Sequence, residues 1–263
     1  MSFMGGLWVF PGGTLCPADT SDAALALIAE PEQIGCDRFL DPQGHPLPQS
    51  LCLGLAMAAH RETFEETGVL LATTANGHEV SGESLARLHE RRRAIVSQPE
   101  LFATHLQGER LRIDMRHLLY WAHWITPSVA PKRFDTRFFV ARLPPRQAAT
   151  IDAVEATEMV WMTPASLMAA AHDGAMTLST PTLFNLMEID ASVRHNVALE
   201  AMFAAEARRD TAPVLPKIVR GEHRIVVMPW DAEYHELPDG GVPREITYPE
   251  RLRALPSRVF THR

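Results

Sequence analysis

The sequence is poor in cysteine and has no pair of cysteines spaced for a metal. Its three cysteines, Cys16, Cys36 and Cys52, form neither a CxxC motif nor an even-numbered framework among 263 residues. This excludes a small domain held together by several disulfides and a cysteine-based zinc site. We expect free thiols in a reducing compartment. The twelve histidines show no HxxxH spacing, so we expect none to bind a structural zinc ion.

Long apolar runs and an excess of positive charge are absent as well. No stretch approaches the length of a membrane span, no basic-then-apolar segment resembles a signal peptide, and residues 259–263 do not form a peroxisomal address of the Ser-Lys-Leu type. The net charge of −7 argues against a nucleic-acid backbone as the main partner. We therefore predict a cytoplasmic protein with no membrane and no nucleic-acid partner.

Several nucleotide-binding motifs are missing too. The chain has no GxGxxG motif, no Walker A loop, no internal repeat and no low-complexity tract. Its length suits one good hydrophobic core with a helical elaboration. A phosphorylated small molecule remains compatible with the negative net charge, because a bound metal ion can supply the local positive charge.

One stretch concentrates acidic side chains at helical spacing. Glu62, Glu65 and Glu66 are three and four residues apart, so on an α-helix they share one face. Gly68 then provides a natural helix stop. A solvated acidic face, with Arg61 paired to Glu65, is the ordinary alternative. Such a cluster of hard oxygen ligands favours a divalent cation such as Mg²⁺.

A glycine turn precedes this helix in the sequence. The segment Trp8-Val9-Phe10-Pro11-Gly12-Gly13 is followed, six positions after its last glycine, by Asp19. Its first half predicts a short strand that ends at the proline, and its glycines allow backbone conformations closed to other residues. Such a turn can bring the Gly12 carbonyl close to a metal ion. An ordinary Pro-Gly turn is the alternative.

The two stretches together resemble the Nudix box. Residues 61–69 have the pattern Arg-Glu-x-x-Glu-Glu-x-Gly followed by an apolar residue, which is the second half of that box, and the glycine turn with its following acid resembles the first half. The acid is Asp19, where the family usually has glutamate. Residues 20–60 separate the halves, where the standard box has seven residues, so about 34 residues are inserted. The chain is identified as a member of the Nudix hydrolases.

A long insertion at this point resembles one branch of that family, the peroxisomal coenzyme A diphosphatases and their bacterial relatives. Residues 133–139 and 179–183 resemble the same branch, and the resemblance runs from about residue 3 to about residue 190. Only seven residues precede Trp8. The strand that the family usually has there is therefore expected to be missing, or the start codon to be assigned too late.

The resemblance implies an α/β fold, namely a Nudix-type α/β/α sandwich with a mixed sheet. We expect a Nudix domain at residues 1–212, with helical insertions at about 20–50 and 83–110. Residues 213–263 would form an extension that packs on the domain or lies in the interface of a possible homodimer.

Periodicity and turn signals predict the individual elements. Helices are expected at residues 21–29, 50–67 and 83–107 with a break at Pro99, from Thr163-Pro164, from Pro181, and at 192–208. Strands are expected at residues 118–125, 133–143 and 159–162, and as a hairpin at 218–220 and 225–228.

The resemblance also assigns roles to individual residues. Mg²⁺ (or Mn²⁺) would be held by Glu62, Glu65, Glu66 and the Gly12 carbonyl. The catalytic candidates are Glu62 and Glu155, with Glu158 in reserve, and Arg61 as the residue that orients a glutamate. Gly13, Asp19 and Gly68 would be structural within the motif.

Substrate phosphates could be bound by arginines outside the motif. Arg133 and Arg137 are candidates, although Asp135 could equally pair with one of them internally. The run Arg91-Arg92-Arg93 is either a solvated helix face or a phosphate-facing cluster on a helical cap over the site.

The resemblance implies a metal-dependent hydrolase that cleaves a phosphoanhydride bond in a nucleoside diphosphate linked to another group. The leading substrate is coenzyme A or an acyl-coenzyme A, which would give a phosphopantetheine and adenosine 3′,5′-bisphosphate. ADP-ribose or a dinucleotide is the alternative substrate. A Nudix-fold module that binds a nucleotide without cleaving it is the alternative function, and the intact Glu62, Glu65 and Glu66 argue against it.

Overall fold

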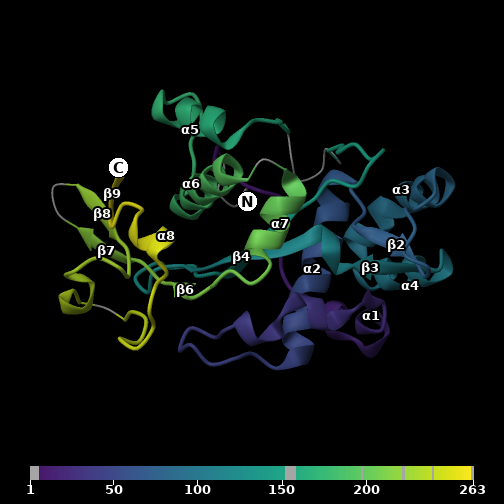
Figure 1. The fold of residues 1–263 in the computed structure, drawn as a ribbon, viewed down its shortest axis with the longest axis horizontal. Helices are drawn as coiled ribbons and strands as arrows, with labels where there is room; N and C mark the ends of the chain where they lie inside the picture. The colour runs from purple at the N-terminus through teal and green to yellow at the C-terminus, as the bar shows by residue number, and fades with distance from the viewer. Residues whose placement is uncertain (1–5, 152–157, 197, 221–222, 239, 262–263) are drawn as a thin grey trace.

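A computed structural model describes residues 6–151, 158–196, 198–220, 223–238 and 240–261. Strand β4 (Leu118–Ile125) runs through the middle of the molecule, with α2 and the smaller helices of the first half at one end and strands β7 to β9 at the other (Figure 1). Every residue of β4 is buried. The strand contributes to two hydrophobic cores, because Leu118 and Tyr120 belong to the first and Trp121 and Trp124 to the second.

The strands form three sheets of three strands each within the described residues. In the sheet around β4, strand β5 (Asp135–Ala141) pairs antiparallel with β4, and β6 (Pro213–Val214) pairs parallel with it. This confirms the predicted α/β fold with a mixed sheet. The register between β4 and β5 shifts between Tyr120 and Ala122. Such an irregularity bends a strand locally, and here it lies where β4 passes from the first core to the second.

The other two sheets lie at opposite ends of β4. Strand β3 (Leu111–Asp114) pairs parallel with β1 (Ile28–Ala29) and antiparallel with β2 (Ala72–Thr74). At the far end, three antiparallel strands follow the order β7-β8-β9, with bounds Lys217–Arg220, Arg224–Val227 and Arg258–Thr261. The pairing of β7 with β8 confirms the predicted hairpin.

Helix α2 (Gln49–Thr67) is the longest described helix and carries the acidic motif. It buries Leu53, Met57 and Phe64 in the first core, on the side of the helix opposite the acids. It ends at Gly68, whose φ of 69° is left-handed, a conformation that glycine adopts without steric cost. The predicted bounds of this helix are confirmed to within a residue.

Two helices cover the end of α2. Helix α3 (Gly82–Ser97) begins at Ser81, whose side chain accepts a hydrogen bond from the Ser84 backbone N–H. The predicted break at Pro99 is confirmed, because α4 (Glu100–Gly108) begins directly after it. Both helices bury apolar residues in the first core, namely Leu88, Ile95, Phe102 and Leu106.

The insertion contains mostly short turns. Its segments are η1 (Pro17–Thr20), α1 (Asp22–Leu25), β1, η2 (Pro31–Ile34) and η3 (Cys36–Arg38). The helix expected at 21–29 is wrong in length, because Ile28 and Ala29 leave the helix to pair with β3. Ser21 caps α1, because its side chain accepts a hydrogen bond from the Ala24 backbone N–H.

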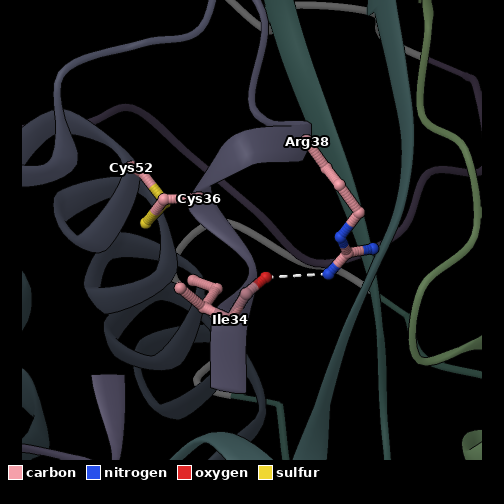
Figure 2. The surroundings of a disulfide bond; sticks show 4 residues. All are labelled: Ile34, Cys36, Arg38 and Cys52. Atoms are coloured by element: carbon pink, nitrogen blue, oxygen red, sulfur yellow. Dashed lines mark hydrogen bonds between the residues drawn. A yellow bond between two sulfur atoms is a disulfide. The ribbon is translucent and has the colours of Figure 1, made fainter. Parts of the chain in front are cut away.

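A disulfide joins the insertion to α2. Cys36 and Cys52 are bonded, with their Cα atoms 5.7 Å apart (Figure 2). The expectation of three free thiols is therefore wrong, and Cys16 is the free cysteine of the three. The insertion folds back over α2 and brings two cysteines 16 residues apart into bonding distance. The cysteines consequently no longer argue for a reducing compartment.

The second half of the chain adds four helices, namely α5 (Pro164–His172), α6 (Thr180–His195), α7 (Leu199–Glu206) and α8 (Glu250–Arg253). Two further short turns are η4 (Met115–His117) and η5 (Tyr234–Glu236). Thr163 caps α5 and Ser179 caps α6, which confirms the two predicted starts to within a residue. The helix expected at 192–208 is wrong at its beginning, because α6 continues to His195. No helix in the described part of the chain is both long and apolar enough to cross a bilayer.

Two predicted strands are not formed. Residues 159–162 adopt no regular structure and are largely exposed, with Trp161 71% exposed, so their apolar side chains find no core to pack against. Near the N-terminus, Trp8 makes a single bridge to Leu178, and Val9 and Phe10 form no strand. The chain there runs beside the start of α6 instead of joining a sheet.

Candidate active site

The glycine turn lies directly on the acidic face of α2. The Gly12 backbone N–H donates a hydrogen bond to Glu66 Oε2 at 3.1 Å. A Cβ atom at Gly13 would lie 2.4 Å from the carboxylate of Glu62, a separation that real side chains do not adopt. Only glycine therefore fits at residue 13 with Glu62 in this position, and the two halves of the motif meet in space.

Arg61 organises the carboxylates around this turn. Its Nε and Nη2 atoms donate to the two oxygens of Asp19, both at 2.9 Å, in a bidentate pair. Its Nη1 atom donates to Glu62 Oε1 at 2.8 Å and to Glu65 Oε1 at 3.2 Å. The remaining bond runs from Nη2 to the Thr14 carbonyl at 3.0 Å, so the arginine also fixes the chain after the glycine turn.

The aspartate that replaces the usual glutamate still reaches its partner. Asp19 lies in η1 and is 2% exposed, like Arg61. Its Oδ2 atom also accepts a hydrogen bond from the Cys16 backbone N–H at 2.9 Å. The first turn of the insertion therefore carries the shorter side chain close enough to Arg61 to form the pair.

Negative charge exceeds positive charge at this cluster. One guanidinium contacts Asp19, Glu62 and Glu65. Burial raises the pKa of Glu65 to about 7, which Arg61 only partly opposes and which the neighbouring Glu62 and Asp19 reinforce. Burial alone would lower the pKa of Arg61, but its bonds to Asp19 and the charges of the two glutamates raise it. A further cation would relieve this imbalance.

The end of α2 is held by α3. Arg92 Nε donates to the Glu65 carbonyl at 2.8 Å, and its Nη atoms donate to Thr150 at 3.2 and 3.0 Å. His89 Nε2 donates a hydrogen bond to the Gly68 carbonyl at 2.8 Å. The middle arginine of the 91–93 run thus packs on the motif helix and does not form a phosphate-facing cluster with its two exposed neighbours.

The arginines proposed from the strand segment lie in different surroundings. Arg137 contacts Asp135 at 2.6 Å, donates to the Leu40 carbonyl at 2.7 Å, and has a side chain 6% exposed. This favours the internal pairing with Asp135. Arg133 is exposed and donates from Nε to the Thr126 carbonyl at 3.1 Å. The structure therefore does not bring the two arginines together at one surface.

Sequence reasoning missed a buried histidine beside that pair. His123 is fully buried in β4, and its Nε2 atom donates to Asp135 Oδ1 at 2.5 Å. A histidine in the middle of an otherwise apolar strand was the available signal. The contact of Phe10 with Phe138 was also missed; their ring centroids are 6.4 Å apart and brace the glycine turn against β5.

Neither candidate general base outside the motif is seen beside the cluster in the described part of the chain. Glu155 lies outside the described residues, and Glu158 is exposed. Glu62 therefore remains the described candidate within the motif, because it contacts both Arg61 and the glycine turn.

The donor chemistry fits a hard divalent cation, although the side chains are arranged around Arg61. In the part of the chain that the structure describes, no three His, Cys, Asp or Glu side chains are grouped to hold one ion. Glu62 and Glu65 direct oxygens to the guanidinium, while Glu66 bonds to the glycine turn. The carboxylates are the ligand type that Mg²⁺ and Mn²⁺ prefer, and they carry surplus negative charge.

Comparison with known proteins agrees with the fold and the motif. The family model of the NUDT19 Nudix domain matches residues 1–189. The chain thus belongs to the NUDT19 branch of the Nudix hydrolases, which makes it an enzyme of the Nudix pyrophosphohydrolase class.

Named relatives lie in the same branch. The acyl-coenzyme A diphosphatase NUDT19 of Xenopus laevis is 26% identical over 266 residues, which cover 90% of this chain and 69% of that protein. The protein of the same name from Gallus gallus is 27% identical over 279 residues, covering 93% and 73%. The crystal structure of a NUDIX hydrolase from Alicyclobacillus acidocaldarius has a TM-score of 0.54 at 23% identity, covering 73% of this chain and 79% of that one. This last likeness shows the fold.

Proposed function

We propose that the protein is a metal-dependent diphosphatase that hydrolyses the phosphoanhydride bond of coenzyme A or an acyl-coenzyme A. The observation that carries the proposal is the carboxylate surplus around Arg61, set against the glycine turn on the face of α2. The substrate class is supported by the relatives named acyl-coenzyme A diphosphatase. The reaction consumes one water and yields a phosphopantetheine (acylated when the substrate is) and adenosine 3′,5′-bisphosphate.

A divalent cation is the cofactor that this cluster would hold. Glu62, Glu65, Glu66 and the Gly12 carbonyl are its proposed ligands, and Mg²⁺ or Mn²⁺ suits these oxygens. When bound, the cation would make water a better nucleophile and neutralise charge on the phosphate oxygens.

The chain's own residues have distinct proposed roles. Arg61 positions Glu62 and Glu65, and Asp19 holds Arg61 in place by the bidentate pair. Glu62 or Glu155 accepts the proton of the attacking water. Gly13 leaves room for the Glu62 carboxylate, and Gly68 ends the helix so that α3 can hold its last turn.

Binding of the substrate phosphates is assigned to exposed cations. Arg133 keeps an accessible guanidinium, so it is the first candidate. Arg137 would have to leave Asp135 and the Leu40 carbonyl to take part.

We infer that residues 1–212 form the hydrolase domain and that residues 213–263 pack on it. Two contacts support this division over a free-standing tail. Strand β6 pairs with β4 at Pro213 and His123, and Arg251 contacts Glu188 of α6 at 3.1 Å.

The test is hydrolysis of a substrate panel by the full chain, with products identified by mass. The panel contains coenzyme A, an acyl-coenzyme A, ADP-ribose, NADH and a diadenosine polyphosphate, each with Mg²⁺ and then Mn²⁺. We expect the coenzyme A compounds to be cleaved fastest and Glu65→Gln to reduce turnover by about 10³-fold. Preference for ADP-ribose or a dinucleotide would overturn the substrate assignment.

Absence of turnover of every compound in the panel would contradict the proposed hydrolase activity. If nucleotide binding persisted in that case, the protein would be a nucleotide-binding module. Circular dichroism of Glu65→Gln is the control. The loss of turnover can be attributed to the missing carboxylate only if the variant is folded.

A further inference from the structure

A buried glycine lies within the helix that carries the acidic motif. Gly54 belongs to α2, seven residues before Arg61. Glycine inside a helix is destabilising relative to alanine. The φ angle of Gly54 is not positive, so its backbone conformation does not call for glycine. The reason for a glycine here therefore lies in what packs against it.

The first turn of the insertion, η1, packs on this glycine. A Cβ atom at residue 54 would lie 2.4 Å from Thr20 Cγ2, a separation that real side chains do not adopt, and 3.5 Å from Leu15 Cδ1. Leu15 and Thr20 flank residues 16–19. The chain on both sides of Asp19 therefore rests on the face of α2 that Gly54 leaves open.

The Thr20 methyl group cannot simply turn away from an added side chain. The Thr20 hydroxyl donates a hydrogen bond to the Pro17 carbonyl at 3.2 Å. Since the methyl and the hydroxyl share one Cβ atom, every χ1 rotation that moves the methyl also moves the hydroxyl off that carbonyl. A side chain at Gly54 would instead push η1 away from α2, until the separation grew from 2.4 Å to the 3.4 Å at which ordinary contact begins.

The same face of α2 carries Arg61. Seven residues are close to two helical turns, and a long side chain on a helix lies over the turn that precedes it. The Arg61 side chain thus extends towards Gly54, where Asp19 accepts two hydrogen bonds from it, both at 2.9 Å. Asp19 is the neighbour of Thr20 in η1. How closely η1 approaches Gly54 therefore decides whether Asp19 reaches Arg61.

We propose that Gly54 is a positioning residue of the metal site and acts through η1. Its missing side chain lets Asp19 come close enough to Arg61 to form the bidentate pair. Arg61 in turn directs the carboxylates of Glu62 and Glu65. That this cluster is a metal site rests on the proposed function, whereas the contact of Gly54 with η1 belongs to the fold and can be measured without metal.

The first experiment uses the full, metal-free chain in EDTA. Asp19→Asn is introduced into wild type and into Gly54→Ala, and the urea midpoints of the four proteins form a double-mutant cycle. We expect Asp19→Asn to lower the midpoint of wild type and to lower that of Gly54→Ala by less than half as much, because the pair with Arg61 is already broken there. Equal decreases in the two backgrounds would overturn the proposal.

Two second substitutions separate positioning from packing. Thr20→Ser removes the methyl that the new Cβ would meet and keeps the hydroxyl for the Pro17 carbonyl. Asp19→Glu lengthens the acid by one bond of about 1.5 Å, which spans the displacement of η1. Each is combined with Gly54→Ala. Both combinations should restore the metal site, the first by returning η1 to its place and the second by extending the acid from a displaced η1.

Mn²⁺ binding, followed by electron paramagnetic resonance, measures the effect on the metal site. Gly54→Ala should bind at least about tenfold more weakly than wild type, and both combinations within about threefold of wild type. Gly108→Ala is the matched control and should bind as wild type does. Gly108 also lies in a helix, α4, and a Cβ there would come within 4 Å of no atom of the described residues.

Unchanged Mn²⁺ affinity in Gly54→Ala would overturn the proposal, as would a combination with Asp19→Glu that binds as weakly as Gly54→Ala alone. If Gly54→Ala failed to fold, the two combinations would carry the test, and failure of either to fold would overturn it. Absence of Mn²⁺ binding by wild type, with the cycle in EDTA as expected, would contradict the proposed metal-dependent function and uphold the contact.

Discussion

Two buried arginines with carboxylate partners occupy the two halves of the molecule. Arg61 contacts Asp19, Glu62 and Glu65 at the end of α2. Arg209, beside the second core, contacts Glu188 at 2.7 Å and Glu206 at 3.1 Å and lies 3.4 Å from the centre of the Trp121 ring. At the level of single contacts, the clusters look alike.

The balance of charge separates them. Arg251 contacts Glu188 as well, at 3.1 Å, so two arginines face two glutamates in the Arg209 cluster. Burial lowers the pKa of Arg209 to about 10, against the opposing effect of its glutamates. At Arg61 the carboxylates prevail and the pKa of the arginine is raised. We propose that the surplus carboxylate beside the glycine turn serves a cation, whereas the matched buried cluster joins parts of the fold.

The largest expected effect comes from exchanging one glutamate for glutamine in each cluster. Glu65→Gln should reduce kcat by about 10³-fold with the fold intact, because metal assistance contributes several kcal/mol and each 1.4 kcal/mol is tenfold. Glu188→Gln should leave kcat unchanged but lower the free energy of unfolding by about 3–5 kcal/mol, because Arg209 would lose the more deeply buried of its two carboxylate partners. Kinetics and urea unfolding of both variants measure this.

The matching glycine variants sharpen the same contrast. At Gly13 a Cβ would meet the Glu62 carboxylate, and at Gly241 it would meet the Tyr234 hydroxyl at 2.6 Å. Gly13→Ala should lower kcat/KM by about 10–100-fold, the usual cost of disturbing residues that orient metal ligands. Gly241→Ala should instead cost about 1–3 kcal/mol of stability through overpacking. If Gly241→Ala lost activity while keeping normal stability, the two glycines would not differ in role as proposed.

A smaller effect is expected at the link between α3 and α2. Arg92→Met removes the hydrogen bonds to the Glu65 carbonyl and to Thr150. We expect kcat to fall about tenfold with little change in KM, because the last turn of α2 would be held less firmly. Arg93→Met, at an exposed position of the same helix, is the control and should leave both constants unchanged. A change confined to KM would assign Arg92 to substrate binding instead.

The smallest effect is the pH dependence of stability from His123. Burial lowers its pKa below the ordinary value of 6.5. Between the two pKa values the unfolded chain binds a proton that the folded chain does not, so stability is complete above pH 6.5 and is lost as the pH falls below it. The free energies of unfolding from urea titrations at about pH 7.5 and 5.5 should differ by up to about 1.4 kcal/mol through this group, because the contribution is lost only below pH 6.5. A free energy of unfolding that rises towards acid pH would contradict this assignment.

The helix that carries the motif could be predicted because its signals are local. Acids at spacings of three and four, an opposite apolar face and Gly68 at the end define α2 without knowledge of the rest of the chain. The contact of Gly13 with Glu62 could be expected only from the family resemblance, since the insertion separates the two residues in sequence.

The remaining features depend on contacts distant in sequence. The Arg209 cluster joins residues 188, 206, 209 and 251, which form no motif. The disulfide depends on how the insertion folds over α2, so the cysteine content alone wrongly predicted free thiols for Cys36 and Cys52. Residues 159–162 have strand-like composition but lie at the surface with no neighbouring strand, so the local pattern misled.

The most direct test of the difference between the two clusters is a titration of the metal-free chain with Mn²⁺, followed by electron paramagnetic resonance. Wild type, Glu65→Gln and Glu206→Gln are compared, because Glu206 belongs to the matched cluster. We predict that wild type and Glu206→Gln bind Mn²⁺ with the same affinity and that Glu65→Gln binds at least about tenfold more weakly. Equal affinity of wild type and Glu65→Gln, or no binding by wild type, would contradict the assignment of the carboxylate surplus at Arg61 to a divalent cation.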